Sequence, residues 1–302
     1  MTYEDILKDI ALNDERYIVM TAEIRADIKN LPFILGDKFI ETGITEQTLI
    51  GSACGLALRG RVPIVHAFAS FLTMRAFEFI RTDIGIANLP VKLVGTSPGL
   101  LSGALGPAHQ AIEDISLMRG IPNVNIFCPA DEEDLLIGIK AVIESPYPFY
   151  IRYINEKSCI KHNPEFNIGK AELVSEGEDI CILTYGFLFK EAFVAKDILE
   201  SKGYSVRLIN LRTLKPIDEN VIIESAKKCK TLVTIEDHFI TGGLYSILAE
   251  IFLKNQIMTK VIPIALANKW FKPALINEVP EYENLTGEKI AVKIVSILSY
   301  NS

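Results

Sequence analysis

The sequence predicts an α/β protein made of two doubly wound sheet domains. Three observations lead to this prediction. The chain has 302 residues, which suits two domains of about 150 residues each. Hydrophobic residues make up 49% of it, enough to build large cores. Short β-branched segments alternate with longer segments of helical spacing, and this alternation is typical of parallel sheets covered by helices.

The first domain is expected over residues 1–154. Its strand-like segments are short and rich in β-branched and aromatic residues, and they cover 17–21, 39–42, 63–68, 91–96, 124–130 and 148–153. Helical spacing covers 70–86, 108–119 and 131–144. The last of these helices opens with acidic residues, which favour a helix N-terminus because they interact with its positive end.

Residues 155–169 lose the alternation and contain Asn, Pro and charged residues, so we predict a linker there. The pattern resumes over 170–302, the expected second domain. Its predicted strands cover 179–186, 205–211, 231–237 and 261–267. Its predicted helices cover 189–202 and 218–228, a segment that opens after Gly242-Gly243, and a last amphipathic segment that ends near Tyr300.

Composition excludes several classes of protein. The net charge of −7 and the pI near 5.3 argue against a nucleic-acid-binding surface. No apolar stretch has the length of a membrane span or the form of a signal peptide. The five cysteines lack metal-binding spacing, so we expect small core residues in a reducing compartment and no metal site on this chain. These features predict a cytoplasmic protein without nucleic-acid or membrane partners.

A glycine-rich loop is the first candidate for a binding site. The segment GTSPGLLSGALGPAHQ (95–110) separates a predicted strand from a helix. It therefore lies at the carboxyl edge of the sheet, where open α/β sheets bind ligands. His109 stands at the exit of this loop. A single histidine there is more often structural than catalytic, so the residue alone decides nothing.

Glu46 is the second candidate. It precedes a helical run of small and apolar residues, and a carboxylate directed into such a surface needs a hydrogen-bonding partner. An interaction with the helix dipole is the simplest explanation. Phe68 and Phe71 follow a predicted strand and fit either the core or a pocket. On residue chemistry alone, the prediction is a ligand-binding α/β protein.

Longer motifs carry a family resemblance. In the first half these are FIETGITEQTLIGSACGLALRGRVPIVHAFASFLTMRAFEFIR, GTSPGLLSGALGPAHQAIEDISLMRGIPNVNIFCPADEEDLL and PFYIRY. They resemble the pyrimidine-binding domain of transketolase. TYGFLFKEA, LRTLKPID and TIEDHFITGGLYS resemble the transketolase C-terminal domain. The likeness runs from Tyr17 to about residue 255 and so covers nearly the whole chain.

The resemblance implies a subunit of a split transketolase. The family's GDG…N magnesium motif has no match here, since Gly36-Asp37-Lys38 departs from it. We therefore expect a separate partner subunit that carries the diphosphate and Mg²⁺ site, in a heterotetramer with two copies of each chain. The implied cofactors are thiamine diphosphate and Mg²⁺, the metal being held mainly by the partner. The implied reaction transfers a two-carbon ketol unit between sugar or sugar phosphate substrates.

Individual residues match positions of known role in the family. Glu46 matches the carboxylate that hydrogen-bonds a ring nitrogen of the thiamine aminopyrimidine and promotes deprotonation of the thiazolium carbon. Phe71 and Phe68 match aromatics that enclose the pyrimidine ring. His109 matches a histidine near the donor oxygen. Arg152 matches an arginine that binds a substrate phosphate, for which guanidinium geometry is suited.

Two positions depart from the family loop GTHxGxxxGxDGxxHQ. Ser97 replaces its first histidine and Leu105 replaces its aspartate, and both of those groups contact substrate hydroxyls in ordinary transketolases. A substrate other than the usual pentose phosphates is therefore expected. The alternatives are half of a 2-oxoacid dehydrogenase β-like or deoxyxylulose phosphate synthase-like enzyme, and a non-catalytic scaffolding subunit. MRGIPNVNIFCPAD and GPAHQAIED favour transketolase over the other two enzymes.

Overall fold

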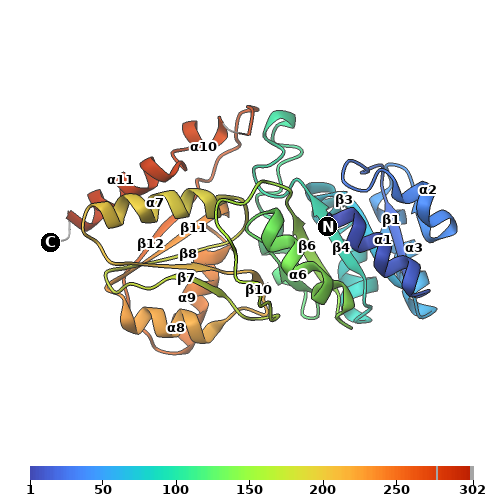
Figure 1. The fold of residues 1–302 in the computed structure, drawn as a ribbon, viewed down its shortest axis with the longest axis horizontal. Coiled ribbons are helices and arrows are strands. Elements are labelled where there is room, and N and C mark those ends of the chain that lie inside the picture. The colour runs from blue at the N-terminus through green and yellow to red at the C-terminus, as the bar shows by residue number, and fades with distance from the viewer. Residues whose placement is uncertain (277, 300–302) are drawn as a thin grey trace.

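A computed structural model describes residues 1–276 and 278–299. It confirms the predicted fold class: the chain forms a seven-stranded sheet and a five-stranded sheet, both mostly parallel and flanked by helices. The two sheets lie side by side along the long axis of the molecule, the first nearer the N-terminus and the second nearer the C-terminus (Figure 1).

The first sheet has the strand order β10-β5-β6-β4-β3-β1-β2. Its strands are β1 (Tyr17–Thr21), β2 (Phe39–Glu41), β3 (Val62–Phe68), β4 (Lys92–Thr96), β5 (Asn125–Phe127), β6 (Phe149–Tyr153) and β10 (Thr213–Lys215). The first six pair in parallel. The central strands are buried on both faces, as expected of a parallel sheet covered by helices. β10 pairs antiparallel to β5 although it comes from the second half of the chain.

Helices pack on both faces of this sheet. They are α1 (Tyr3–Asn13), α2 (Leu31–Leu35), α3 (Glu46–Leu58), α4 (Phe77–Phe79), α5 (Asp114–Arg119) and α6 (Glu132–Glu144), with short 3₁₀ turns η1 (Gly36–Lys38) and η4 (Gly103–Leu105). The expected helix over 70–86 is instead α4 between two π-helical segments, η2 (Phe71–Arg75) and η3 (Ile80–Ile86). The expected helix over 108–119 begins only at Asp114, because Ala111 pairs with Gly99 and keeps the preceding residues in the loop.

The second sheet has the order β12-β11-β8-β9-β7. Its strands are β7 (Glu172–Ser175), β8 (Ile180–Thr184), β9 (Val206–Asn210), β11 (Thr231–Phe239) and β12 (Val261–Leu266). Only β7, which was not expected, pairs antiparallel. Its helices are α7 (Phe189–Ser201), α8 (Glu219–Lys228), α9 (Leu244–Lys254), α10 (Val279–Tyr282) and α11 (Gly287–Ser299), with a 3₁₀ turn η5 (Gly186–Leu188).

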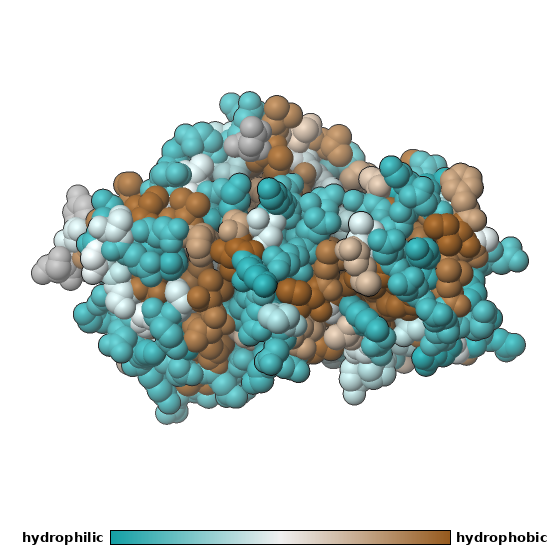
Figure 2. Space-filling view, in the orientation of Figure 1, coloured by the Kyte–Doolittle hydropathy of each residue, from teal (hydrophilic) through white to brown (hydrophobic). Residues whose placement is uncertain are grey.

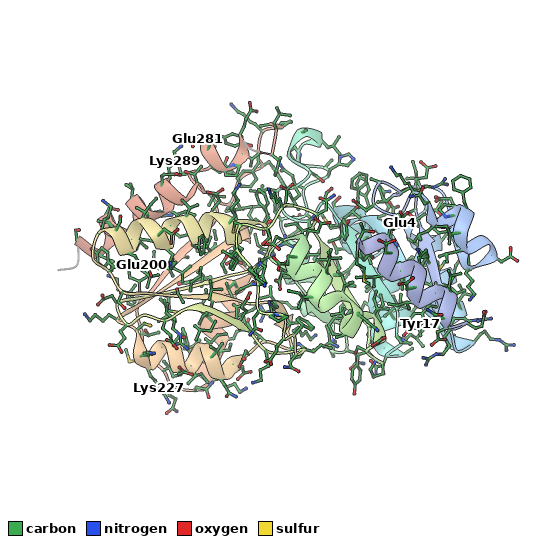
Figure 3. All side chains as sticks on the ribbon, in the orientation of Figure 1. Glu4, Tyr17, Glu200, Lys227, Glu281 and Lys289 are labelled. Atoms are coloured by element: carbon green, nitrogen blue, oxygen red, sulfur yellow. The ribbon has the colours of Figure 1, made fainter. Side chains whose placement is uncertain are left out.

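Helices α7 and α11 cover one face of the second sheet, and α8 and α9 cover the other (Figure 1). The expected end of the last helix, near Tyr300, lies outside the described residues. Lys289 of α11 binds Glu281 of α10 at 2.6 Å, and the two side chains lie close together in Figure 3. This ion pair connects the last two helices at the surface.

The predicted linker, 155–169, contains no helix or strand. It is nevertheless anchored, because the buried His162 bonds Asp131 at the start of α6 and Glu172 in β7, at 2.8 and 2.7 Å. Burial alone lowers the pKa of His162, but these two hydrogen bonds outweigh burial and raise the pKa to about 10. A charged imidazole therefore ties the two halves of the chain together.

Four of the five cysteines are buried, as expected, but Cys159 is exposed, so the prediction that all are core residues is wrong at this position. It lies in the linker, at the edge of a pocket that Phe187 and Phe189 also line. Figure 2 shows hydrophilic residues over most of the visible face, with hydrophobic patches between them. Among the described residues, no helix is both long and apolar enough to cross a membrane.

Candidate active site

The candidate site lies at the carboxyl edge of the first sheet. Phe68 ends β3 and Thr96 ends β4, and these neighbouring parallel strands lead into the segments that carry the predicted site residues. Helix α3 starts at Glu46, shortly after β2. Because the carboxyl ends of parallel strands meet at one edge, residues far apart in sequence are brought together there.

Glu46 is the first residue of α3 and only 2% exposed. Its carboxylate accepts a hydrogen bond from Arg75 Nη1 at 2.8 Å. The Arg75 side chain is 42% exposed, so one end of this ion pair is buried and the other reaches the surface. Since a buried carboxylate without a partner is costly, Arg75 is what makes the burial of Glu46 possible in this chain.

Three aromatic rings pack edge-to-face beside this pair. The Phe71 and His109 ring centroids are 4.9 Å apart, those of Phe68 and His109 are 5.5 Å apart, and those of Phe68 and Phe71 are 5.9 Å apart. The Arg75 guanidinium lies over the Phe71 ring, 4.2 Å from its centroid. The structure therefore brings together four of the predicted site residues, Glu46, Phe68, Phe71 and His109, in one cluster.

His109 brings an unsatisfied polar atom to this cluster. Its Nδ1 is buried and has no hydrogen-bonding partner in the described part of the chain. Buried polar atoms in folded proteins are nearly always paired, so an orphaned atom in an aromatic cluster indicates a missing ligand group. The next residue, Gln110, is 1% exposed, and both polar atoms of its amide also lack a partner among the described residues.

The glycine-rich loop is fixed against the second half of the chain. Gly99 and Ala111 exchange backbone hydrogen bonds of 3.0 and 3.1 Å, which close the loop on itself. Ala274 N–H donates to the Gly103 carbonyl at 3.2 Å. Ser97 adopts the left-handed region with φ of 51°, and Leu105 is 56% exposed. The two residues that depart from the family loop thus belong to an ordered segment, and Leu105 presents an apolar side chain to the exterior.

Arg152 has a different set of partners. It is 2% exposed, and it bonds Asp114 through Nε at 2.9 Å and Asp237 through Nη1 at 2.8 Å. Tyr150 also donates to Asp114, at 2.7 Å. The cation therefore joins the first half of the chain to β11 of the second half. Arg152 Nη2 is buried and has no hydrogen-bond partner among the described residues, so the two carboxylates do not use the whole guanidinium. The phosphate-binding role of Arg152 stays a prediction.

Sequence reasoning missed Arg75 and Gln110. Arg75 follows Phe71 by four residues, a spacing that places helical side chains on one face, and this spacing was the available signal. Gln110 adjoins His109, but nothing in the sequence indicates that its amide is left unpaired. The ion-pair partner Asp237 lies 85 residues from Arg152, and no local pattern connects them.

The residues present fit a flat, nitrogen-containing aromatic ring. Glu46 offers a buried carboxylate for a ring nitrogen, Phe71 offers a ring face, and His109 has a free nitrogen. For a metal, the described residues place together one group of ligand types, Asp134, His162 and Glu172. Arg212 pairs with both of these carboxylates, and the charged His162 also bonds Glu172, so two cations already balance the two carboxylates and the group does not fit Mg²⁺.

The chain is thus an α/β protein whose mostly parallel first sheet carries, at its carboxyl edge, a candidate site with a buried carboxylate and aromatic rings. Family comparison narrows this class. The family model described as "Transketolase, pyrimidine binding domain" matches residues 1–158, and "Transketolase, C-terminal domain" matches residues 169–298. The chain therefore belongs to the transketolase family, whose cofactor is thiamine diphosphate.

Similar proteins include separate transketolase subunits. The "6-deoxy-6-sulfo-D-fructose transketolase subunit SqwH" of Clostridium sp. (strain MSTE9) is 33% identical over 84% of this chain and 80% of its own length. A solved structure described as "Split gene transketolase, inactive beta4 tetramer" matches with a TM-score of 0.87 at 31% identity, covering 98% of this chain and 97% of that one. The 1-deoxy-D-xylulose-5-phosphate synthase of Dictyoglomus turgidum is 37% identical over 87% of this chain but only 43% of its own length.

Proposed function

We propose that this chain is the pyrimidine-binding subunit of a split transketolase that transfers a two-carbon ketol unit between sugar or sugar phosphate substrates. One observation supports this proposal most strongly: the buried Glu46 carboxylate and the Phe71 ring both contact Arg75, and the orphaned His109 nitrogen belongs to the same cluster. Domain boundaries at 1–154 and 170–302 around a linker at 155–169 belong to the same proposal.

Thiamine diphosphate, when bound, supplies the group that stabilises the carbanion formed on the transferred unit. This chain's residues would hold and orient it. Glu46 would share a proton with a nitrogen of the aminopyrimidine, since its buried carboxylate accepts from one side-chain donor, Arg75, and could accept from the ring instead. Phe71 and Phe68 would enclose the ring and exclude water. His109 would use Nδ1 to bond an oxygen of the sugar.

A partner subunit would complete the site. We infer that it carries the diphosphate and Mg²⁺ site and assembles with this chain as two copies of each. The relative from Clostridium is named as a subunit, and the solved split-gene structure is described as an inactive tetramer. By analogy, this chain alone should fold and self-associate without catalysing the reaction. The free cysteines are consistent with a cytoplasmic complex.

The substrate would differ near Ser97 and Leu105. A leucine at the second position cannot accept a hydrogen bond, whereas the aspartate usual in this family loop can. An acceptor with fewer hydroxyl groups at the contacted carbon avoids the cost of an unpaired hydroxyl. One relative is named as a subunit of a 6-deoxy-6-sulfo-D-fructose transketolase, and this name supports a modified sugar as the substrate. Arg152 would offer its unpaired Nη2 to an anionic end of the substrate, and because this atom is buried the segments around it would have to open first.

Hydrogen–deuterium exchange at the thiazolium carbon tests the proposal in the assembled complex. Glu46→Gln is nearly isosteric but cannot exchange a proton with the ring, so we expect exchange to slow by about 10²–10⁴-fold. Glu41→Gln is the matched control, because Glu41 also pairs with an arginine, Arg25 at 2.8 Å, but is not in the cluster. If Glu46→Gln has the same exchange rate as wild type, Glu46 has only a structural role, and a scaffolding subunit is favoured.

A second candidate is half of a 1-deoxy-D-xylulose-5-phosphate synthase-like enzyme, favoured by the identity of 37% to the Dictyoglomus protein. A 1-deoxy ketose has a methyl group where a ketol unit has a hydroxymethyl group, so its synthesis needs an acetyl-level two-carbon donor, such as pyruvate after loss of CO₂, in place of a ketose. Supplying the complex with pyruvate or with a ketose phosphate as donor, each with an aldose acceptor, separates the two candidates. Release of CO₂ from pyruvate with no turnover of the ketose would favour the synthase.

A further inference from the structure

Arg75 makes both contacts that the aminopyrimidine would make. Its guanidinium lies 4.2 Å from the centre of the Phe71 ring, and its Nη1 donates to Glu46 at 2.8 Å. A guanidinium is planar, delocalised and rich in N–H donors, so it stacks on aromatic faces and bonds carboxylates in the way that a flat aminated ring does. The two contacts together place the head of Arg75 between the carboxylate and the aromatic ring.

We propose that Arg75 is a placeholder: in the cofactor-free chain it occupies the slot of the aminopyrimidine, and it must leave when the ring enters. This proposal rests on the proposed function of Glu46 and Phe71. A ring that bonds Glu46 and stacks on Phe71 needs the volume between these two groups, and Arg75 fills it. The cofactor therefore binds by exchange with a side chain rather than by entry into an empty slot.

The exposure of the two partners indicates which of them moves. The Glu46 side chain is 3% exposed and belongs to a regular helix, whereas the Arg75 side chain is 42% exposed and ends the π-helical segment η2. Arg75 can turn into water without burying an unpaired charge. Glu46 cannot lose its donor without such a cost, so the departure of Arg75 is coupled to the arrival of a new donor.

Arg75 also stabilises the subunit before the cofactor is bound. A buried carboxylate with no donor would destabilise the free subunit, and Arg75 supplies that donor until the ring does. The same contact lowers the affinity for the cofactor, because the cofactor can bind only those molecules in which Arg75 has left the slot. The apparent dissociation constant therefore equals the intrinsic dissociation constant divided by the fraction of such molecules. Stability of the free subunit and cofactor affinity are therefore expected to change in opposite directions when Arg75 is altered.

Calorimetric titration of the two-subunit complex with thiamine diphosphate and Mg²⁺ tests the placeholder. Arg75→Ala empties the slot and should tighten binding by about tenfold. Arg75→Lys keeps the charge but not the flat head, and should give an affinity between those of wild type and Arg75→Ala. Arg81→Ala is the matched control, since Arg81 is an exposed arginine of the adjoining segment η3 and should not change the affinity.

A second readout uses the full chain alone. Arg75→Ala should lower its melting temperature, and Arg81→Ala should not. Weaker or unchanged cofactor binding in Arg75→Ala would overturn the placeholder while leaving the proposed function intact. If the wild-type complex itself binds no thiamine diphosphate, the proposed function fails and the placeholder fails with it. If wild type binds and Arg75→Ala binds more tightly, both are supported.

Discussion

Replacing Arg152 by methionine should destabilise the protein strongly, because it leaves two carboxylates buried without a cation. Asp114 and Asp237, its partners at 2.9 and 2.8 Å, are 0% and 1% exposed. Removing one partner of a buried ion pair typically costs about 3–5 kcal/mol, since the remaining charge stays desolvated and unpaired. We therefore expect Arg152→Met to lower the free energy of unfolding by at least about 3 kcal/mol.

Arg207→Met is the matched control. Arg207 is also 2% exposed and also bonds two carboxylates, but its partners Glu176 and Glu224 are 57% and 61% exposed. Water solvates these carboxylates when the cation is removed, so this substitution should cost far less. Urea denaturation followed by circular dichroism measures both variants, and a midpoint shift without a change in slope reports stability alone.

A rescue variant and a kinetic measurement complete the test. Arg152→Met combined with Asp114→Asn and Asp237→Asn removes the unpaired charges and should recover part of the lost stability. Equal losses for Arg152→Met and Arg207→Met would refute the reasoning from partner burial. A stable Arg152→Met variant whose KM rises only for phosphorylated sugars would instead assign Arg152 to the substrate phosphate.

Three further predictions concern the loop, the linker and the substrate. Gly99→Ala should destabilise more than Gly60→Ala: both glycines have positive φ, 58° and 83°, which costs about 1–2 kcal/mol for alanine, but only at Gly99 would the methyl group overlap the Asp237 carboxylate. Equal melting temperatures would contradict this. His162 has its pKa raised to about 10, so the stability it adds is complete below about pH 6.5 and disappears as the pH rises towards 10. Between pH 6.5 and 10 the melting temperature should therefore fall more steeply with pH for wild type than for His162→Gln. Parallel curves of melting temperature against pH would exclude a stabilising charge on His162. Leu105→Asp in the assembled enzyme should shift kcat/KM towards ribose 5-phosphate over its 2-deoxy analogue by about one to two decades. No shift, with wild type already preferring ribose 5-phosphate, would refute a specialised substrate.

Local sequence patterns predicted the two-sheet α/β architecture and most of its elements. The spacing of hydrophobic residues within a segment indicates whether that segment forms a buried strand or a helix with one buried face. This spacing can be recognised without knowing which distant segments the element contacts. The starts of two helices were also predictable from the sequence, because each begins at an aspartate that caps it. Asp131 caps α6 by accepting from the Asp134 N–H, and Asp218 caps α8 by accepting from the Val221 N–H. The family motifs also identified Glu46, Phe71 and His109, whose spatial grouping the structure then showed.

Tertiary structure alone decided the contacts between distant segments. The strand β10 comes from the second half of the chain but pairs with β5 of the first sheet. It is only three residues long, too short for its hydrophobic pattern to indicate a pairing partner. Residues 108–113 resemble the start of a helix, but the pairing of Ala111 with Gly99 holds them in the loop. The hydrogen bond from Arg75 to Glu46 and the ion pair from Arg152 to Asp237 likewise depend on which elements meet at the sheet edge. A local pattern records that a side chain is buried, whereas the packing of the whole chain decides which charge lies next to it.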